Sequence, residues 1–476
     1  MTKCVLNVIA WVFIFAGVVE AVWGLCQMYG LAQSYHSLFA LTGSFYNPGP
    51  YSGFLSMTFP VCLHKCLESR ANKKSVAYCL TLIAMLLIIS VLPAGMSRSA
   101  WIAGILASVY VVILFRGTYP KELILSKKRI SLFLILTIVF FIGIYFLKKD
   151  SANGRILMWK IATEAVIEQP WNGYGWDYVA GVYGQAQEKY FSEGNYTKLE
   201  EYVADSPSYV FNEYLQVALA WGIPVLCLLL LVISISAYGL HRKRNYGLCG
   251  ALLSLCIFSF ASYPFQFWLF IASLGVLLIA GISCILPSNK MNIVFLSTTI
   301  SCGGLWLVSY VQKEEMRNEI GEKIHLLYQT GQNEEVVKES KSFYEQMQKD
   351  SRFMFEYGCA LHKQQRHEES NEVLEEALNL TSVPTVQYVI GLNYQKMQQY
   401  HEAETWLLRS TKRLPGRIYP YYLLAKLYNE TDCFPEEKLK WAVRMVLEKE
   451  PKVYSTAIKQ MREEVKVFVS PKENNE

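Results

Sequence analysis

The sequence contains little charge for its length. Of its 476 residues, 18% are charged and 52% are hydrophobic, whereas an ordinary soluble protein has about 25% charged residues. The charge is also unevenly placed, because residues 312–476 carry 51 of the 85 formal charges and residues 1–311 carry 34. The low charge of residues 1–311 excludes a chain that folds as a single soluble globular domain, and the high hydrophobicity excludes a disordered chain. A polytopic membrane protein with a soluble C-terminal domain remains.

Patterns that hold metals are also missing. Twelve cysteines are present, but they form no CxxC pair and no other metal-ligand spacing. The net charge is +5, yet the basic residues cluster in short segments between apolar runs instead of forming a stripe, which argues against nucleic-acid binding. No histidine occurs in residues 148–211. We therefore expect no metal, no cofactor and no nucleic-acid partner.

Long apolar runs fill the first 311 residues. A helix needs about 20 apolar residues to cross the hydrocarbon core, and the ~10-residue alternating segments of a membrane β-barrel are absent from this part of the sequence. The runs therefore predict helices, because lipid leaves no other open way to satisfy backbone groups. We predict an all-α fold: a membrane domain at 1–311 with an outside loop at 148–211, and a soluble domain at 312–476. About nine spans are expected, near 4–30, 51–68, 76–95, 100–116, 129–147, 212–239, 247–264, 267–286 and 292–311.

The basic residues between the runs predict an orientation, since cytoplasmic loops are rich in lysine and arginine. One set of loops holds 14 of the 21 basic residues of this half. We therefore expect a cytoplasmic N-terminus, and the odd number of spans places residues 312–476 outside. The inside set is Lys3, Lys65, Arg70, Lys73, Lys74, Arg116, Lys121, Lys127, Lys128, Arg129, Arg242, Lys243, Arg244 and Lys290; the opposite set is Arg98, Lys148, Lys149, Arg155, Lys160, Lys189 and Lys198.

Residues 312–476 repeat themselves with a period of 33–34 residues. The segment from Gly358 matches the segment from Gly391, and further copies begin near Ile324 and Ala425. This pattern resembles tetratricopeptide repeats, which are helix-turn-helix units that stack into a solenoid. The resemblance implies a binding surface without chemistry of its own, and a generic helical bundle is the alternative.

Two arginines stand out at the predicted outer face. Arg98 lies in a turn of about four residues between two apolar spans, and Arg155 lies where the long outside loop begins. Ionisable residues destabilise membrane helices, so their presence there indicates a function. A guanidinium is permanently charged and offers a planar fork that binds phosphate oxygens. Two of them could hold a diphosphate presented at the membrane surface. The alternatives are a snorkelling turn residue for Arg98 and an ordinary loop cation for Arg155. Lys160 has no role in this scheme.

Four blocks of residues carry a resemblance to a family. The blocks are Gly43-Ser-Phe-Tyr-Asn47-Pro-Gly-Pro-Tyr51-Ser-Gly53 through Pro60; Ser97-Arg98-Ser99-Ala100-Trp101; Gly154-Arg155 with Trp159 and Pro170-x-x-Gly173-x-Gly175; and Asn212-Glu213-Tyr214-Leu215-Gln216 with Gly222. With the four blocks in this order, the chain resembles the O-antigen ligase and polymerase superfamily, which includes the bacterial protein O-oligosaccharyltransferases. The resemblance covers about residues 43–235.

The resemblance implies an inverting, metal-independent glycan transfer. The donor would be a glycan on undecaprenyl diphosphate, and the acceptor a hydroxyl on a lipid, another glycan or a protein. By the same resemblance, Arg98 and Arg155 would bind the donor diphosphate and stabilise its developing charge as a leaving group. Asn47, Trp159 and Asn212 would be substrate-binding residues. A protein partner of the repeat domain is also expected.

The chain departs from the family pattern at the proton acceptor. The histidine that precedes the asparagine of the last block is replaced by Phe211, and the acidic residue two before Gly222 is replaced by Ala220. A general base contributes about 10²–10⁴-fold in rate. Glu213 is the nearest carboxylate and is our catalytic candidate. The other candidates are His36, Asp177, Glu200, Glu201 and Asp205.

These observations predict a multi-pass enzyme of the bacterial inner membrane that transfers or polymerises a polyprenyl-diphosphate-linked glycan on the periplasmic side. The type is that of an O-antigen ligase or a protein O-oligosaccharyltransferase. Two alternatives stay open. One is a surface-polysaccharide chain polymerase. The other is a membrane-anchored repeat scaffold whose catalytic half has decayed, an idea prompted by Phe211.

Overall fold

The computed structural model describes residues 3–118, 149–286 and 290–469. Within these ranges every regular element is a helix and no strand occurs, so the all-α prediction is confirmed for them. The predicted span at 129–147 lies outside the described residues. The other eight predicted spans coincide with helices; seven have ends within about five residues of the prediction, whereas the helix at 292–311 continues to Gln329.

The chain packs as two compact units. Unit 1 consists of Met1–Lys149, Phe211–Tyr214 and Pro224–Val311, and unit 2 consists of Asp150–Val210, Leu215–Ile223 and Gln312–Glu476. The residues of the long outside loop therefore pack with the C-terminal residues. A functional division at 311/312 stays a prediction.

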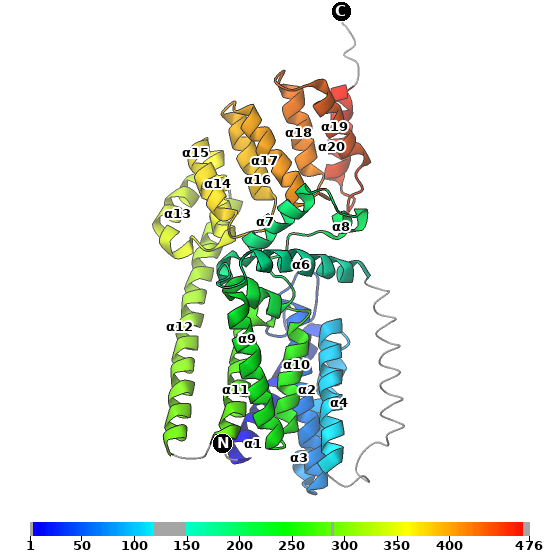
Figure 1. Ribbon diagram of the computed structural model, residues 1–476, viewed down its shortest axis with the longest axis vertical. Coiled ribbons are helices and arrows are strands. Elements are labelled where there is room, and N and C mark those ends of the chain that lie inside the picture. Colours follow the sequence, from blue (N-terminus) through cyan, green and yellow to red (C-terminus); the bar gives the residue numbers. More distant parts are fainter. Residues whose placement is uncertain (1–2, 119–148, 287–289, 470–476) are drawn as a thin grey trace, which may run out of the picture. The chain divides into compact units, whose positions relative to one another are not determined.

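Unit 1 is built around α2, which packs against α1, α3, α4 and α10 (Figure 1). Its core consists of apolar side chains of these helices and of α11, such as Tyr51, Leu55 and Phe258. The helices are α1 (Lys3–Met28), α2 (Pro48–Ala71), α3 (Ser75–Val91), α4 (Arg98–Thr118), α9 (Glu213–Arg242), α10 (Tyr246–Ser259) and α11 (Trp268–Ile285).

Four of the described helices are long and apolar enough to cross a membrane: α1, α4, α9 and α11. The apolar helices α3 and α10 are shorter, with 17 and 14 residues. The chain is therefore a membrane protein, whereas the number of nine spans stays a prediction. Both short helices stop before the predicted spans end. Pro93 follows α3 after one residue, and a proline supplies no N–H to continue a helix.

The helix α9 contains a break near its start. Gly222 has φ 83° and ψ 168°, a conformation outside the helical region, and Pro224 follows it. Beyond the break, α9 packs closely on α11 because small residues meet. A Cβ on Gly239 would lie 2.0 Å from the carbonyl oxygen of Gly281, and Ser236 Oγ donates to the Leu278 carbonyl at 3.1 Å. Small residues allow such close approach in membrane helices.

Unit 2 contains residues 150–210, most of the segment that the sequence predicted as a loop, and a row of helical hairpins. The loop part folds into α6 (Lys149–Glu168), the short η2 (Trp176–Tyr178), α7 (Val179–Ser192) and α8 (Lys198–Val203). The long helix α12 (Lys290–Gln329) leads into the C-terminal helices. They are α13 (Asn333–Met347), α14 (Ser351–Lys363), α15 (His367–Ala377), α16 (Thr385–Lys396), α17 (Tyr400–Arg413), α18 (Tyr419–Glu430), α19 (Glu436–Glu448) and α20 (Thr456–Val469).

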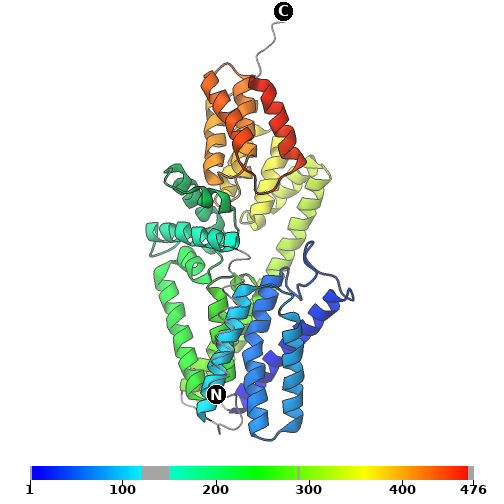
Figure 2. The same cartoon turned by 90° about the vertical axis from the view of Figure 1, so that its right-hand side faces the viewer.

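We call α13–α20 the C-terminal array. Each of its helices packs mainly on the preceding and the following one, as Figure 2 shows for the hairpins coloured yellow to red. Repeated positions carry the same packing role, since Gly358 lies against Leu374 and Gly391 lies against Leu407 in successive hairpins. Nearest-neighbour packing is typical of repeat proteins. The assignment to tetratricopeptide repeats stays a prediction.

Candidate functional site

Arg98 is the first residue of α4, and its side chain is half-buried. The turn that precedes it runs from Leu92 to Ser97, two residues longer than predicted. This turn is fastened at both ends. The indole N–H of Trp101 donates to the Leu92 carbonyl at 2.9 Å, and Gly95 lies so close to α2 that a Cβ would meet Ser52 Oγ at 1.9 Å. The turn and the start of α2 are thereby held together.

An apolar cavity of about 320 Å³ opens beside the first three turns of α4. Trp101, Gly104 and Ile105 line it from α4, and hydrophobic residues of α2 and α3 line the other sides. Only two serines, Ser56 and Ser108, bring polar side chains to it. The cavity can therefore take a hydrocarbon chain whose polar end lies near the start of α4.

The last motif block lies at the start of α9, where Glu213 is buried with 1% exposure. Glu213 Oε1 accepts a hydrogen bond from the Phe265 N–H at 2.6 Å, whereas Oε2 has no hydrogen-bond partner among the described residues. The Tyr214 hydroxyl donates to the Cys256 carbonyl at 2.8 Å. A carboxylate oxygen without a hydrogen-bond donor keeps its capacity to accept one.

Two motif blocks share one open cavity of unit 1. This cavity has a volume of about 390 Å³, and both Ser99, which follows Arg98, and Tyr214, which follows Glu213, line it. Ile102 and four residues at or just after the end of α10, namely Cys256, Ile257, Phe260 and Ala261, complete its lining. The structure therefore brings residues of the second and fourth blocks to the same cavity.

Phe211 precedes Asn212 at the position where the sequence pattern led us to expect a histidine, and its backbone conformation is unusual. Its φ is 53°, which is rare for a bulky side chain, and its ring meets Tyr263 edge to face with 5.0 Å between the centroids. Strained residues of this kind gather at functional sites. An aromatic contact therefore occupies the place of the expected base.

The two candidate asparagines cap helices. Asn47 precedes α2, and its side-chain oxygen accepts the Gly49 N–H at 2.9 Å. Asn212 is buried, and its side-chain oxygen accepts the Tyr214 N–H at 3.0 Å. Both side chains thus satisfy free amides at helix starts. Substrate binding by either residue stays a prediction, and the capping role could have been read from the asparagine–proline and asparagine–glutamate pairs.

Arg155 and Trp159 lie in unit 2, one turn apart on α6, and both side chains are half-buried. The sequence placed Arg155 in a loop, but α6 is a regular helix of 20 residues. Lys160, the next residue, is tied to the rest of the unit. Its ammonium donates to the Tyr190 hydroxyl at 2.6 Å and to Glu200 Oε1 at 3.3 Å.

The glycines of the third block explain its pattern. Gly173 and Gly175 have φ values of 63° and 97°, which glycine adopts without strain. A Cβ on Gly173 would lie 2.5 Å from the Trp221 nitrogen, and a Cβ on Gly222 would lie 2.2 Å from the Trp171 carbonyl oxygen. The segment Pro170–Gly175 therefore packs directly on the backbone at the α9 break, within unit 2.

The remaining base candidates have structural partners. The His36 ring accepts the Leu38 N–H, Asp177 pairs with Lys349 at 3.4 Å, and Glu201 pairs with Lys449. Glu200 closes a capping box with Thr197. Burial raises its pKa, but hydrogen bonds from the Thr197 N–H, Tyr190, the Thr197 hydroxyl and Lys160 outweigh this and lower the pKa to about 2. A carboxylate of that kind is a poor base at neutral pH.

In the described part of the chain, no group of three or more His, Cys, Asp or Glu side chains could hold a metal ion. Within unit 1, the neighbours of Arg98 and Glu213 in the sequence, Ser99 and Tyr214, line one cavity. Arg155, Trp159 and the glycine block belong to unit 2.

A comparison with protein families finds one similarity within this part of the chain. Residues 83–230 match the O-antigen ligase family. The match contains Arg98, Arg155 and the last block, and it ends before the array, so that it covers less than half of the chain. No curated protein matches the sequence. The O-antigen ligase segment implies a membrane glycan ligase or polymerase that uses a lipid-linked glycan.

Proposed function

We propose that the protein transfers or polymerises a glycan carried on undecaprenyl diphosphate, with a hydroxyl group as acceptor, on the periplasmic side of the inner membrane. Arg98 and Arg155 supply guanidinium groups to the donor diphosphate, and Glu213 accepts the proton. The O-antigen ligase match at 83–230 supports the reaction class. No metal or cofactor has a role in this scheme.

One observation carries the proposal: Arg98 stands at the N-terminus of α4, directly before an apolar cavity of about 320 Å³. A helix N-terminus attracts anions because its amide groups point outward, and a guanidinium at the same place adds a cation whose planar fork suits phosphate oxygens. A polyprenyl diphosphate combines the two properties that this place selects, an anionic head and a long hydrocarbon chain.

The reaction needs two events at the sugar. The acceptor oxygen attacks the anomeric carbon, a new C–O bond forms on the opposite face, and the bond to the diphosphate oxygen breaks with its electron pair. The configuration at the anomeric carbon inverts. The hydroxyl proton moves to the base, for which Glu213 Oε2 is suited because Phe265 fixes only the other carboxylate oxygen. Positively charged groups stabilise the leaving diphosphate.

The experiment is glycan transfer by the purified full-length protein in lipid vesicles. The donor is a defined oligosaccharide on undecaprenyl diphosphate, and three acceptors are offered separately: a second lipid-linked glycan, a lipopolysaccharide core and a serine-rich peptide. Transfer to the lipopolysaccharide core indicates a ligase, and transfer to the peptide indicates an oligosaccharyltransferase. Chain extension on the lipid-linked glycan alone indicates the polymerase. No consumption of donor in any arm would leave the membrane-anchored scaffold as the better account.

Glu213→Gln separates the proton acceptor from the fold. Glutamine keeps an oxygen for the Phe265 N–H but accepts no proton, so we expect transfer to fall about 10²–10⁴-fold with unchanged thermal unfolding. Glu193→Gln is the control, because Glu193 is exposed and has no role in the chemistry. Equal activity of both variants would remove Glu213 from the mechanism.

A further inference from the structure

The loop residues of unit 2 follow one edge of the C-terminal array, along the turns that join successive hairpins. The contacts reach the α13–α14 turn through Asp177, the α15–α16 turn through Gly181, and the α17 end through Glu188. Two further contacts reach the segment after α19: Lys449 pairs with Glu201, and Lys452 Nζ donates to the Ala204 carbonyl at 2.6 Å. The array thus binds a segment of its own chain over four successive turns.

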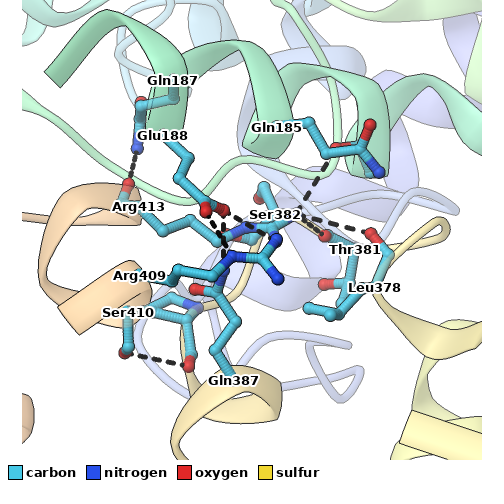
Figure 3. Close-up of polar contacts among 12 residues, drawn as sticks. Gln185, Gln187, Glu188, Leu378, Thr381, Ser382, Gln387, Arg409, Ser410 and Arg413 are labelled. Carbon is cyan, nitrogen blue, oxygen red and sulfur yellow. Dashed lines mark hydrogen bonds and ion pairs between the residues drawn. The ribbon is translucent and has the colours of Figure 1, made fainter. Parts of the chain in front are cut away.

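Arg413 is the centre of this contact, and its side chain is completely buried (Figure 3). Its guanidinium donates to the carbonyl oxygens of Thr381 at 2.8 Å and Ser382 at 3.2 Å, and at 3.4 Å to that of Gly181 in α7. The carbonyl of Arg413 in turn accepts the Gln187 amide at 2.6 Å. Arg413 therefore joins the α15–α16 turn, the end of α17 and α7.

Glu188 supplies the opposite charge from α7. Its carboxylate accepts Arg409 Nε at 2.7 Å and the Gln387 amide at 2.7 Å, and it lies 3.8 Å from Arg413 Nη1 (Figure 3). Burial lowers the pKa of Arg413 to about 10, although Glu188 opposes the shift, so the guanidinium stays charged at neutral pH. Removing one partner of a buried ion pair is strongly destabilising, because the other charge is left uncompensated.

Two glycines of α7 allow the close approach. A Cβ on Gly184 would lie 2.4 Å from Arg413 Nη2, and a Cβ on Gly181 would lie 2.1 Å from the Asn379 carbonyl oxygen. Both distances are shorter than real Cβ contacts, so the α7 surface is shaped for this edge. An accidental surface contact would not require glycine at both places.

The docked helix α7 also holds α6. The Tyr190 hydroxyl near the end of α7 accepts Lys160 of α6 at 2.6 Å and donates to Glu200 at 2.8 Å. Lys189 forms an ion pair with Glu168 of α6 at 2.5 Å. A chain of contacts therefore runs from the array through α7 to the helix that carries Arg155.

We propose that the C-terminal array positions Arg155, with Arg413, Arg409 and Glu188 as the positioning residues that hold α7 and, through it, α6. This inference rests on the proposed function, since it assigns the array a task in that reaction. Catalytic groups displaced by about 1 Å can lose about 10²-fold in rate. The array then acts on its own loop, in addition to any external partner.

The test uses the full-length protein in vesicles with Glu188→Ala and Arg413→Lys. Two readouts are taken: amide hydrogen exchange of residues 179–192, and transfer kinetics with the lipid-linked donor. Arg366→Ala is the matched control, because Arg366 lies in the same array and, among the described residues, forms its ion pair with Glu369 of α15. We expect both test variants to exchange at least ~10-fold faster in α7 and to lose kcat ~10-fold or more with little change in the acceptor KM. The control should match the wild type.

A double substitution shows whether the effect passes through Arg155. In an Arg155→Lys background, Glu188→Ala should cause little further loss, because the group that it positions is already impaired. If Glu188→Ala instead lowers the transfer rate by the same factor in the Arg155→Lys background as in the wild type, the array has a purely structural role. Rapid exchange of α7 with wild-type transfer would also overturn the inference and leave the proposed function intact. Absence of transfer by the wild-type protein would overturn the proposed function, and the positioning role with it.

Discussion

The charge of Arg98 stands where a helix disfavours cations, at the first residue of α4. In the proposed scheme the guanidinium and the outward-pointing amides of the helix start bind the donor diphosphate together, and they stabilise the charge that develops on it in the transition state. Arg155 differs, because it lies within a helix next to the Lys160 network of unit 2.

Substitutions at the two arginines should reveal their roles. Alanine at Arg98 or Arg155 removes charge and fork, so we expect transfer to fall about 10²–10³-fold. Lysine keeps the charge but loses the fork, and should be impaired less. The readout is the initial rate of transfer at equal amounts of inserted protein. Arg116→Ala, at the opposite end of α4, is the control. Wild-type rates for both alanine variants would refute diphosphate binding by these residues.

The Glu200 carboxylate predicts a pH dependence of stability. Its pKa in the folded protein is lowered to about 2, against an ordinary value of about 4.3. A group with a lowered pKa stabilises the fold above the unfolded pKa, and this contribution is lost as the pH falls towards 2. The midpoint of thermal unfolding of Glu200→Gln should therefore lie below the wild type at pH 7, and the difference should shrink between pH 5 and 3. The exposed Glu193→Gln is the control, and a difference that grows on acidification would contradict the account.

At the scale of elements, the break in α9 is a defined joint. Gly222 combines a positive φ of 83° with backbone atoms 2.2 Å from the position of a Cβ, whereas Gly331 has a similar φ of 76° and open space around it. Gly331→Ala should therefore cost only the backbone strain, about 1–2 kcal/mol. Gly222→Ala should cost clearly more, measured as the free energy of unfolding in detergent. Equal costs would show that the 170–175 segment yields without strain.

The sequence predicts elements better than it predicts their partners. Apolar runs located eight helices because hydrophobic length reflects the thickness of lipid. The helix α6 was missed because the sequence around Arg155 is neither apolar nor bounded by clear caps. Lys160 received no role, since no pattern links it to Tyr190, 30 residues away. The contact between Glu188 and Arg413 was equally hidden, because two ordinary charged residues give no signal of burial.

At the scale of the molecule, the sidedness of the membrane half stays a prediction. The basic residues Lys3, Lys65, Lys74 and Lys243 come from three separate segments of the predicted inside set, and all of them line one cavity of unit 1. Residues that share a side of the membrane should lie together in this way. The loop residues 150–210 pack with the C-terminal array in unit 2, which agrees with a common compartment for both.

Reporter fusions test this sidedness. A reporter that is active only outside the cytoplasm should work after residue 330 and within 180–200. It should fail near 122 and near 243, in the basic loops. Western blots of each fusion control for its amount. Activity at 243 together with inactivity after 330 would show that the orientation is the reverse of the predicted one. The proposed site would then face the cytoplasm.

The central claim is that this chain breaks the bond between a glycan and a polyprenyl diphosphate and passes the glycan to a hydroxyl. The most direct measurement is a single-turnover reaction in vesicles with a doubly labelled donor, in which released undecaprenyl diphosphate and transferred glycan are counted together and the new linkage is examined by NMR. The account predicts equal amounts of both, an inverted anomeric configuration, and loss of both products in the Arg98→Ala protein. Retention of configuration, or release of the lipid diphosphate without transfer of the glycan, would contradict it.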